Sequence, residues 1–298
     1  YIKKQFSEAK IDWIVEKQFV GILENNPDIQ TIYPLHLKNN RRHFFQEYQK
    51  LKTIAKQNQY DVVLDLQGLI KSAIVARILS KNCVGFNKQS LREPLAAWLY
   101  KTSFDIPYEE NVIMRNLMLT CLALNIPLPN IQTKKPFLFS TFQSSFFPEL
   151  LIITGSSWRS KVYPKEHFIT IINTLNIKSF VAWGNEQEQE DAQFICSHTN
   201  ATMLPKIDLN ELKAIIKNSH LVIGADTGPT HMAWASERPS ITIFGPTPSG
   251  RNTVQTAINI VVDCEKSIDV KKINKHDFCI QQINPNKIIM LAQSLLAC

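Results

Sequence analysis

The sequence predicts an α/β protein built from two doubly wound domains, and three observations favour this fold class. The chain has 298 residues, enough for two domains of about 150 residues each. Short apolar runs alternate with amphipathic stretches, as in parallel sheets flanked by helices. A stretch with several prolines and little periodicity, residues 126–145, separates two such series. We therefore expect domains at residues 1–145 and 146–298, with ligands in their shared cleft at the carboxyl ends of the strands.

The pattern of apolar residues in the first half of the sequence predicts alternating strands and helices. Amphipathic helices are expected at residues 44–58 and 69–79, as crossovers between parallel strands. Residues 1–6 are typical of a helix end, whereas a doubly wound domain begins with a strand and a loop. We therefore expect about 20–30 further residues before Tyr1. The predicted strands are residues 11–15, 31–35, 62–66 and 83–86.

The second half repeats this pattern. Asp208, followed three residues later by Glu211, resembles a capping box at a helix start. The closing helix is expected in the second domain, with packing back on the first domain as an alternative. Continuous apolar runs, typical of buried parallel strands, lie at residues 150–154, 180–183, 221–223 and 241–244. The predicted helices are residues 165–175, 186–197, 209–218, 230–236 and 285–296.

Composition excludes several classes of protein. Hydrophobic residues make up 44% and charged residues 20% of the chain, which excludes a disordered or collagen-like protein. No apolar run approaches the roughly 18 residues that span a bilayer, and no leader opens the chain, so we expect neither an integral nor a secreted protein. The six cysteines are scattered without a CxxC pair, which fits the cytosol and indicates neither a zinc site nor a redox pair.

Positive charge is concentrated in the first half of the chain. The net charge is +7, of which residues 1–149 carry +6 and residues 150–298 carry +1. This asymmetry favours an anionic partner for the first domain, with ordinary solubility charge as the alternative.

The densest chemistry lies in the run GADTGPTH at residues 224–231. It follows a predicted strand and opens a predicted helix, so the backbone amides around Gly228 are expected to form an anion site at the helix N-terminus. We expect Asp226 to accept hydrogen bonds from ligand hydroxyls, Thr227 to donate to a phosphate oxygen, and His231 to face the same ligand-binding opening. The alternative is a capped turn in which Asp226 serves only the backbone.

Two further loops follow predicted strands of the same sheet. In TGSSWRSK, residues 154–161, small residues let the backbone approach an anion and Lys161 offers a cation to a diphosphate; the alternative is a solvated connection. In the next loop, Glu186 either binds ribose hydroxyls or favours its own helix N-terminus. Three such loops at one edge predict a nucleotide-diphosphate site.

Missing motifs narrow the choice of ligand. The chain lacks GxGxxG and GxxxxGK[ST], which disfavours dinucleotide binding and NTP hydrolysis, and it lacks an Asp-x-Asp pair that would hold a metal on a diphosphate. We therefore expect a nucleotide sugar bound with no cofactor and no metal. Lys161 and the helix end would then stabilise the leaving group.

These motifs resemble those of one enzyme family. The GADTGPTH run, together with Arg238-Pro239, FGPT at residues 244–247, Trp183-Gly184 and DLQGLIKS at residues 65–72, is similar to the bacterial lipopolysaccharide heptosyltransferases, glycosyltransferase family 9. Within this family, QGLIKS at residues 67–72 and LREPL at residues 91–95 resemble the transferase of the inner core more than the second transferase. The similarity covers nearly the whole chain.

The resemblance implies a GT-B fold, with two Rossmann-like domains facing a central cleft, the first binding acceptor and the second donor. It implies inverting, metal-independent transfer of L-glycero-D-manno-heptose from ADP-heptose to the first Kdo of Kdo2-lipid A. The expected location is the cytoplasm, peripherally on the cytosolic face of the inner membrane. The partners implied are ADP-heptose, Kdo2-lipid A and the anionic inner-leaflet surface, with no nucleic acid.

The resemblance also assigns roles to residues of the site. Asp226 matches the residue that holds heptose hydroxyls, and Lys161 matches the lysine at the donor phosphate; these two are the expected catalytic residues. The family's general base, an Asp on the first loop, is expected before Tyr1, and Asp65 is instead expected to order the loop before Gly68. The remaining expected residues are Ser156, Ser157, Glu186, Thr227, Gly228 and His231 for the donor, and Lys71, Arg92 and Arg115 for the acceptor.

Some interpretations stay open at this point. The run Arg41-Arg42-His43-Phe44-Phe45 predicts either a membrane-surface patch or a solvated helix start. A heptosyltransferase that acts on an already heptosylated core, a non-catalytic ADP-binding module and, more distantly, an NAD-dependent dehydrogenase are the alternative functions.

Overall fold

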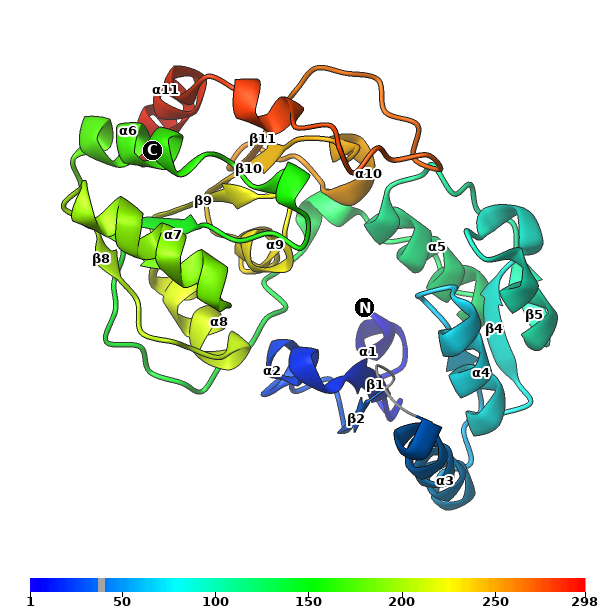
Figure 1. The fold of residues 1–298 in the computed structure, drawn as a ribbon. Coiled ribbons are helices and arrows are strands. Elements are labelled where there is room, and N and C mark those ends of the chain that lie inside the picture. Colours follow the sequence, from blue (N-terminus) through cyan, green and yellow to red (C-terminus); the bar gives the residue numbers. More distant parts are fainter. Residues whose placement is uncertain (37–40, 298) are drawn as a thin grey trace. The chain divides into compact units, whose positions relative to one another are not determined.

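Each strand pair of the structure runs parallel, as expected when helices connect consecutive strands. The computed structural model describes residues 1–36 and 41–297, without the side chains of residues 41–44 and 133. Helices lie between most of the consecutive strands along the chain (Figure 1). The predicted α/β class is confirmed.

The chain forms two compact units. The first contains residues 1–20 and 28–131, and the second contains residues 21–27 and 132–298. The sequence placed the division after residue 145, whereas in the structure the stretch that follows residue 131 belongs with the second unit.

The first unit contains two small parallel sheets. β1 (Asp12–Glu16) pairs with β2 (Thr31–Leu35), and β4 (Cys83–Phe86) lies between β3 (Val63–Leu64) and β5 (Thr102–Phe104). The sequence predicted the first four strands but missed β5, in which Thr102 and Ser103 are exposed. The helical segments that precede β6 in the chain are α1 (Ile2–Gln5), η1 (Lys17–Phe19), α2 (Val20–Leu23), α3 (Arg41–Gln57), α4 (Ile70–Leu79), η2 (Lys88–Ser90), η3 (Pro94–Leu99), α5 (Val112–Leu124) and η4 (Ile131–Thr133).

Asp65 orders the turn between β3 and α4. Its carboxylate accepts hydrogen bonds from the backbone N–H groups of Gln67 (3.0 Å) and Gly68 (3.1 Å), and from the hydroxyls of Ser72 (2.8 Å) and Tyr100 (2.7 Å). Gly68 has a φ of 68°, a left-handed conformation that glycine adopts without steric cost. Burial and the adjacent Asp65 raise the pKa of Tyr100. The expected ordering role of Asp65 is therefore confirmed.

The second unit is built on one six-stranded parallel sheet with the order β11-β10-β9-β6-β7-β8. β8 and β11 lie at its two edges and were not predicted, whereas the four central strands coincide closely with the predicted ones. The strands are β6 (Leu150–Ile153), β7 (Ser179–Ala182), β8 (Thr202–Met203), β9 (Leu221–Ala225), β10 (Ser240–Phe244) and β11 (Asn259–Asp263). The helical segments are η5 (Arg159–Lys161), α6 (Lys165–Leu175), α7 (Glu186–Ser197), α8 (Leu209–Asn218), α9 (Gly228–Ala235), α10 (Ser249–Asn252), η6 (Cys279–Gln282) and α11 (Pro285–Leu296).

Successive residues of the central strands face opposite sides of this sheet. In β6, Leu150 and Ile152 belong to one buried cluster, while Leu151 and Ile153 belong to another. Both faces are covered, which explains why the strand is apolar at every position. Ile288 of α11 lies in the first of these clusters, so the closing helix packs against the core of the second unit.

A buried lysine helps to hold residues 21–27 in the second unit. Lys213 of α8 is 2% exposed, and its ammonium group donates to the backbone carbonyls of Glu24 (2.8 Å) and Phe139 (2.5 Å). Burial lowers the pKa of Lys213. Asp208 and Glu211 form the predicted capping box at the start of the same helix.

Candidate functional site

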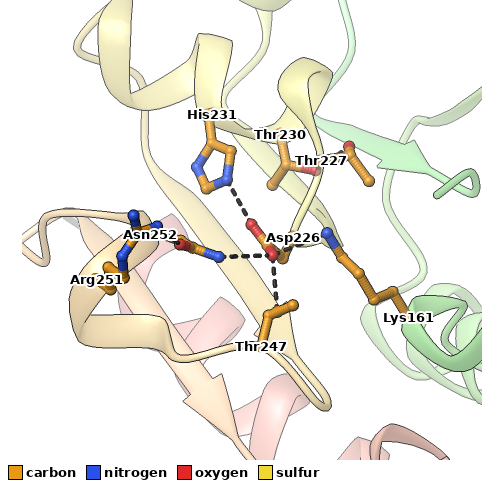
Figure 2. A network of polar contacts seen from close by, with 8 residues as sticks. All are labelled: Lys161, Asp226, Thr227, Thr230, His231, Thr247, Arg251 and Asn252. Atoms are coloured by element: carbon orange, nitrogen blue, oxygen red, sulfur yellow. Dashed lines mark hydrogen bonds and ion pairs between the residues drawn. The ribbon is translucent and has the colours of Figure 1, made fainter. Parts of the chain in front are cut away.

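Polar side chains gather where adjacent strands of the six-stranded sheet end. β10, β9, β6 and β7 are neighbours and run parallel, so the segments that follow them lie at one edge of the sheet. Three of these segments form the cluster: the β9–α9 turn, the loop that leads from β6 into η5, and the segment after β10 that contains α10. Figure 2 shows the residues that they bring together: Lys161, Asp226, Thr227, Thr230, His231, Thr247, Arg251 and Asn252.

The carboxylate of Asp226 is the centre of this cluster. Its Oδ1 accepts a hydrogen bond from His231 Nε2 at 2.8 Å, and its Oδ2 forms an ion pair with Lys161 Nζ at 2.9 Å. Oδ2 also accepts hydrogen bonds from Thr247 Oγ1 at 2.7 Å and from Asn252 Nδ2 at 3.2 Å. The capped turn in which Asp226 serves only the backbone is therefore wrong.

The cluster keeps Asp226 ionised. Burial alone would raise the pKa of Asp226, but the hydrogen bond from His231 and the charge of Lys161 outweigh it and hold that pKa well below its usual range. An ionised carboxylate only accepts hydrogen bonds, so Nε2 of His231 carries a proton and Nδ1 is the ring nitrogen left for a ligand. With four donors on its two oxygens, Asp226 is best suited to position Lys161 and His231.

The turn before α9 combines close packing with open space. A Cβ on Gly224 would lie 2.5 Å from Thr230 Oγ1, so strand and helix approach too closely here for any side chain. At Gly228, by contrast, a Cβ would meet open space: apart from its chain neighbours and the nearby helix backbone, no described residue has an atom within 4 Å of that position. Thr227 is the N-cap residue of α9, but its side chain accepts no hydrogen bond from the backbone N–H groups of the first turn. The N-terminus of α9 thus has open space beside Gly228, at the end of the helix where an anion site would form.

The loop after β6 contains hydroxyls that the protein does not satisfy. Ser156 Oγ and Ser160 Oγ are buried and make no hydrogen bond to any residue that the structure describes. Ser157 is exposed, so the two expected donor serines have different surroundings. A buried hydroxyl without a partner is uncommon, and a ligand or water oxygen near Lys161 would satisfy it.

Glu188, which the sequence analysis passed over, joins the loop after β6 to the loop after β7. Its carboxylate accepts hydrogen bonds from Gly184 N–H (2.7 Å) and Asn185 Nδ2 (2.6 Å). A Cβ on Gly155 would lie only 2.1–2.4 Å from atoms of the same carboxyl group. Glu186, the predicted ribose contact, is exposed. The only signal for Glu188 was its place in the first turn of a helix, where any carboxylate is favourable.

Thr247 and Asn252 were also missed as site residues. Thr247 belongs to the FGPT run, but a threonine after a strand has no distinctive pattern of its own. Asn252 lies 26 positions after Asp226, and only the course of the chain through α10 brings its amide to the carboxylate (Figure 2).

The three predicted acceptor residues lie in the first unit and differ in exposure. Lys71 and Arg92 are exposed. Arg115 is 6% exposed, packs over the rings of Phe86 and Tyr108, and donates to Ser90 O at 2.6 Å. Arg115 thus supports the short segment that leads to Arg92. The side chains of Arg41, Arg42, His43 and Phe44 lie outside the described residues.

Positive charge at the cluster comes from the side chains of Lys161 and Arg251 and from a helix end. Lys161 provides a fixed ammonium group, and the N-terminus of α9 provides the positive end of a helix dipole. Across the described part of the chain, no group of three or more His, Cys, Asp or Glu side chains is placed to hold a metal ion.

Comparison with solved structures defines the fold. The fold is similar to that of the Escherichia coli heptosyltransferase WaaC with ADP, with a TM-score of 0.84 and 24% identity, over 98% of this chain and 92% of that one. E. coli ADP-heptose lps heptosyltransferase II gives a TM-score of 0.74 and 17% identity, over 99% and 92%. The chain therefore has the GT-B glycosyltransferase fold.

Comparison of sequences then identifies the family. Residues 48–278 match glycosyltransferase family 9 (heptosyltransferase). The lipopolysaccharide heptosyltransferase 1 of Campylobacter coli is 39% identical over 99% of this chain and 92% of its own length, and that of E. coli K12 is 28% identical over 81% and 80%. The chain belongs to glycosyltransferase family 9.

Replacing Asp226 with Asn tests the central role of its carboxylate. Asp226→Asn leaves a buried lysine without its ion-pair partner, and we expect it to lower the free energy of unfolding by about 3 kcal/mol at pH 7. Because folding lowers the pKa of Asp226, its stabilisation is complete above the ordinary carboxyl range, about pH 4, and is lost as the pH falls below that range. Urea titrations from pH 8 to pH 3 should show a constant difference between the two proteins above about pH 5 that shrinks below pH 4. A difference that does not depend on pH would contradict this role.

Replacing Gly155 with Ala tests the contact of Glu188 with the first loop. The new Cβ displaces the Glu188 carboxylate, so we expect Gly155→Ala to weaken ADP binding about tenfold by disturbing both loops. Gly250→Ala is the control, because a Cβ at Gly250 would meet open space. Calorimetric titration with ADP measures the effect, and equal affinities of the two variants would rule out the coupling.

Proposed function

We propose that the protein transfers L-glycero-D-manno-heptose from ADP-heptose to the first Kdo of Kdo2-lipid A, with inversion and without a metal. The observation that carries the proposal is the 39% identity, over 99% of this chain, to a lipopolysaccharide heptosyltransferase 1. The cluster around Asp226 supplies the groups that such a transfer needs on the donor side. In the reaction, the acceptor oxygen bonds to the anomeric carbon, the bond from that carbon to the diphosphate breaks, and a base takes the hydroxyl proton.

Stabilising the departing ADP is the main task of the donor site. Lys161 and the N-terminus of α9 offer a cation and backbone donors to the developing diphosphate charge. Asp226 holds Lys161 and His231 in place before substrate binds, so little reorganisation is needed during the reaction. Thr227 and His231 complete the diphosphate contacts, and Ser156 and Ser157 remain donor-binding residues of this proposal.

Glutamates at the start of α7 are proposed to bind the ribose of the donor. The Glu188 carboxylate uses two of its acceptor positions on Gly184 and Asn185 and has capacity for a hydroxyl. Glu186, which is exposed and lies two residues before Glu188, is the second candidate.

The acceptor is proposed to bind to the positively charged first half of the chain. Kdo carboxylates and lipid A phosphates are anions, and residues 1–149 carry a net charge of +6. Lys71 and Arg92 would contact the acceptor directly. Arg115, whose side chain is buried, would act by supporting the segment that precedes Arg92.

The decisive test is the transfer reaction itself. We expect the full-length protein, given ADP-heptose and Kdo2-lipid A with EDTA present, to add one heptose, as detected by mass spectrometry. Lys161→Met removes a leaving-group contact, so it should lower kcat by about 100-fold or more. Lys165→Met is the matched control, because Lys165 makes a surface ion pair with Asp191 at 3.3 Å.

Other outcomes of this assay separate the alternatives. Transfer only to a heptosylated core would identify the second heptosyltransferase activity. ADP binding without any heptose transfer would favour the binding module, and a product that forms only when EDTA is omitted would reject metal independence.

We also propose that the protein binds peripherally to the cytosolic face of the inner membrane. Leu95 and Trp98 of η3 are 61% and 78% exposed and lie three positions apart, so in a 3₁₀-helix they share one face. Arg92, exposed and three positions before Leu95, adds a cation that anionic lipid attracts. Tryptophan favours the interfacial region of a bilayer. No helix among the described residues is long and apolar enough to cross a membrane.

Vesicle binding tests this surface. We expect sedimentation with phosphatidylethanolamine/phosphatidylglycerol vesicles, and Trp98→Ser should weaken the binding about tenfold because a large apolar side chain no longer inserts. Met290→Ser removes a side chain that is 65% exposed on α11 and is the matched control. If Trp98→Ser and wild type sediment equally, η3 is not the membrane-binding surface.

A further inference from the structure

The ion pair between Lys161 and Asp226 does not by itself balance the charge of a diphosphate. The ammonium group of Lys161 is already paired with the Asp226 carboxylate at 2.9 Å, so this pair adds no net charge. A nucleoside diphosphate group brings about two negative charges into the same region, and fixed protein cations must balance them when no metal does so. The question is which further cation lies beside the loop of Lys161.

A basic loop between β11 and η6, residues 265–278, approaches that loop. Its base is closed by the ion pair between Lys266 and Asp277 at 3.3 Å, and Asp277 also accepts a hydrogen bond from Cys279 N–H at 3.0 Å. η6 then anchors the loop, because Ile280 is fully buried and a Cβ on Gly245 would lie 2.8 Å from it. The basic loop carries Lys266, Lys271, Lys272, Lys275 and His276.

One lysine of the basic loop reaches the loop that carries Lys161. The ammonium group of Lys275 lies 4.6 Å from the centroid of the Trp158 ring. The ammonium group of Lys161 lies 5.6 Å from the same centroid. Two cations therefore share one indole ring, which attracts each of them without neutralising its charge.

Lys275 differs from Lys161 in its partners. No carboxylate of the described residues lies within ion-pair distance of Lys275, whose recorded contact is the face of Trp158. Lys275 is also exposed, so its charge can meet a ligand that arrives from solvent. Its full charge is thus held by an aromatic ring next to a loop that contains two buried, unsatisfied hydroxyls, Ser156 Oγ and Ser160 Oγ.

We infer that Lys275 is a second diphosphate-binding cation of the donor site, held in place by Trp158. This inference rests on the proposed donor, a nucleoside diphosphate sugar. Lys161, tied to Asp226, fixes one end of the diphosphate, while Lys275 provides the net charge that the Lys161–Asp226 pair lacks. The basic loop thereby contributes to donor affinity without being part of the sheet edge.

Calorimetric titration with ADP and AMP tests this assignment. We expect Lys275→Met to weaken ADP binding about fivefold, as removal of an exposed cation contact would, and to weaken AMP binding less because AMP lacks the second phosphate. The dependence of ADP affinity on salt concentration should also become shallower. Lys272→Met, in the same loop and with the same change of charge, is the matched control and should retain the wild-type affinity.

A second variant tests the part played by the indole ring. Trp158→Leu should weaken ADP binding, and adding Lys275→Met to it should cost much less than the same change costs in the wild type, because the ring that positions Lys275 is gone. Additive effects of the two substitutions would reject the positioning role of Trp158.

The outcomes for this inference and for the proposed donor are distinguishable. If the wild-type protein does not bind ADP, the proposed donor is wrong. If the wild type binds ADP while Lys275→Met binds it equally well, or if Lys272→Met is weakened as much as Lys275→Met, the donor proposal stands and the role of Lys275 is rejected.

Discussion

An ionised carboxylate that is almost fully removed from water needs several donors, and Asp226 has four of them. The donors come from η5, α9 and the α10 segment, so satisfying this one charge fixes three separate parts of the chain with respect to each other. The cost of burying the charge is thereby offset within the folded protein, before any substrate is present. The same arrangement leaves Lys161 and His231 oriented in advance, which is the condition under which charged groups stabilise a leaving group well.

This arrangement depends in turn on the parallel sheet. Because neighbouring strands end at the same edge, three loops that are distant in sequence come together there. Glycine then has two opposite uses at this edge. Gly155 and Gly224 let other groups approach where a side chain would collide with Glu188 or Thr230, whereas Gly228 has open space at the position of a Cβ. The loops can therefore differ in sequence around a constant geometry.

Lys161, Asp226 and His231 were accessible to sequence analysis because each lies between a recognisable strand and the next helix or in the first turn of that helix. Glu188, Thr247 and Asn252 were not, since their contribution is a contact and none of them lies in a distinctive pattern. Arg115 illustrates the reverse case. Its charge suggested a role in binding an anionic acceptor, yet it is buried beneath Phe86 and Tyr108 and donates to a backbone carbonyl. Residue type gives the charge of a side chain, whereas only packing gives its exposure.

The sequence by itself determined the α/β class, the four central strands of the six-stranded sheet and the bounds of most helices in the second unit. Burial on both faces of a sheet imposes continuous apolar runs, and a helix with one buried face imposes its own period of apolar residues. The edge strands β5 and β8 escaped it, since an edge position tolerates polar residues and short pairing. β11 was missed although its residues 260–262 are apolar. Tertiary structure alone decided that residues 21–27 belong with the second unit, where Lys213 holds their carbonyl groups, and that Lys275 lies over Trp158. Such contacts join positions that are far apart in the chain, and they arise only when the folded backbone brings those positions together, so no local pattern records them.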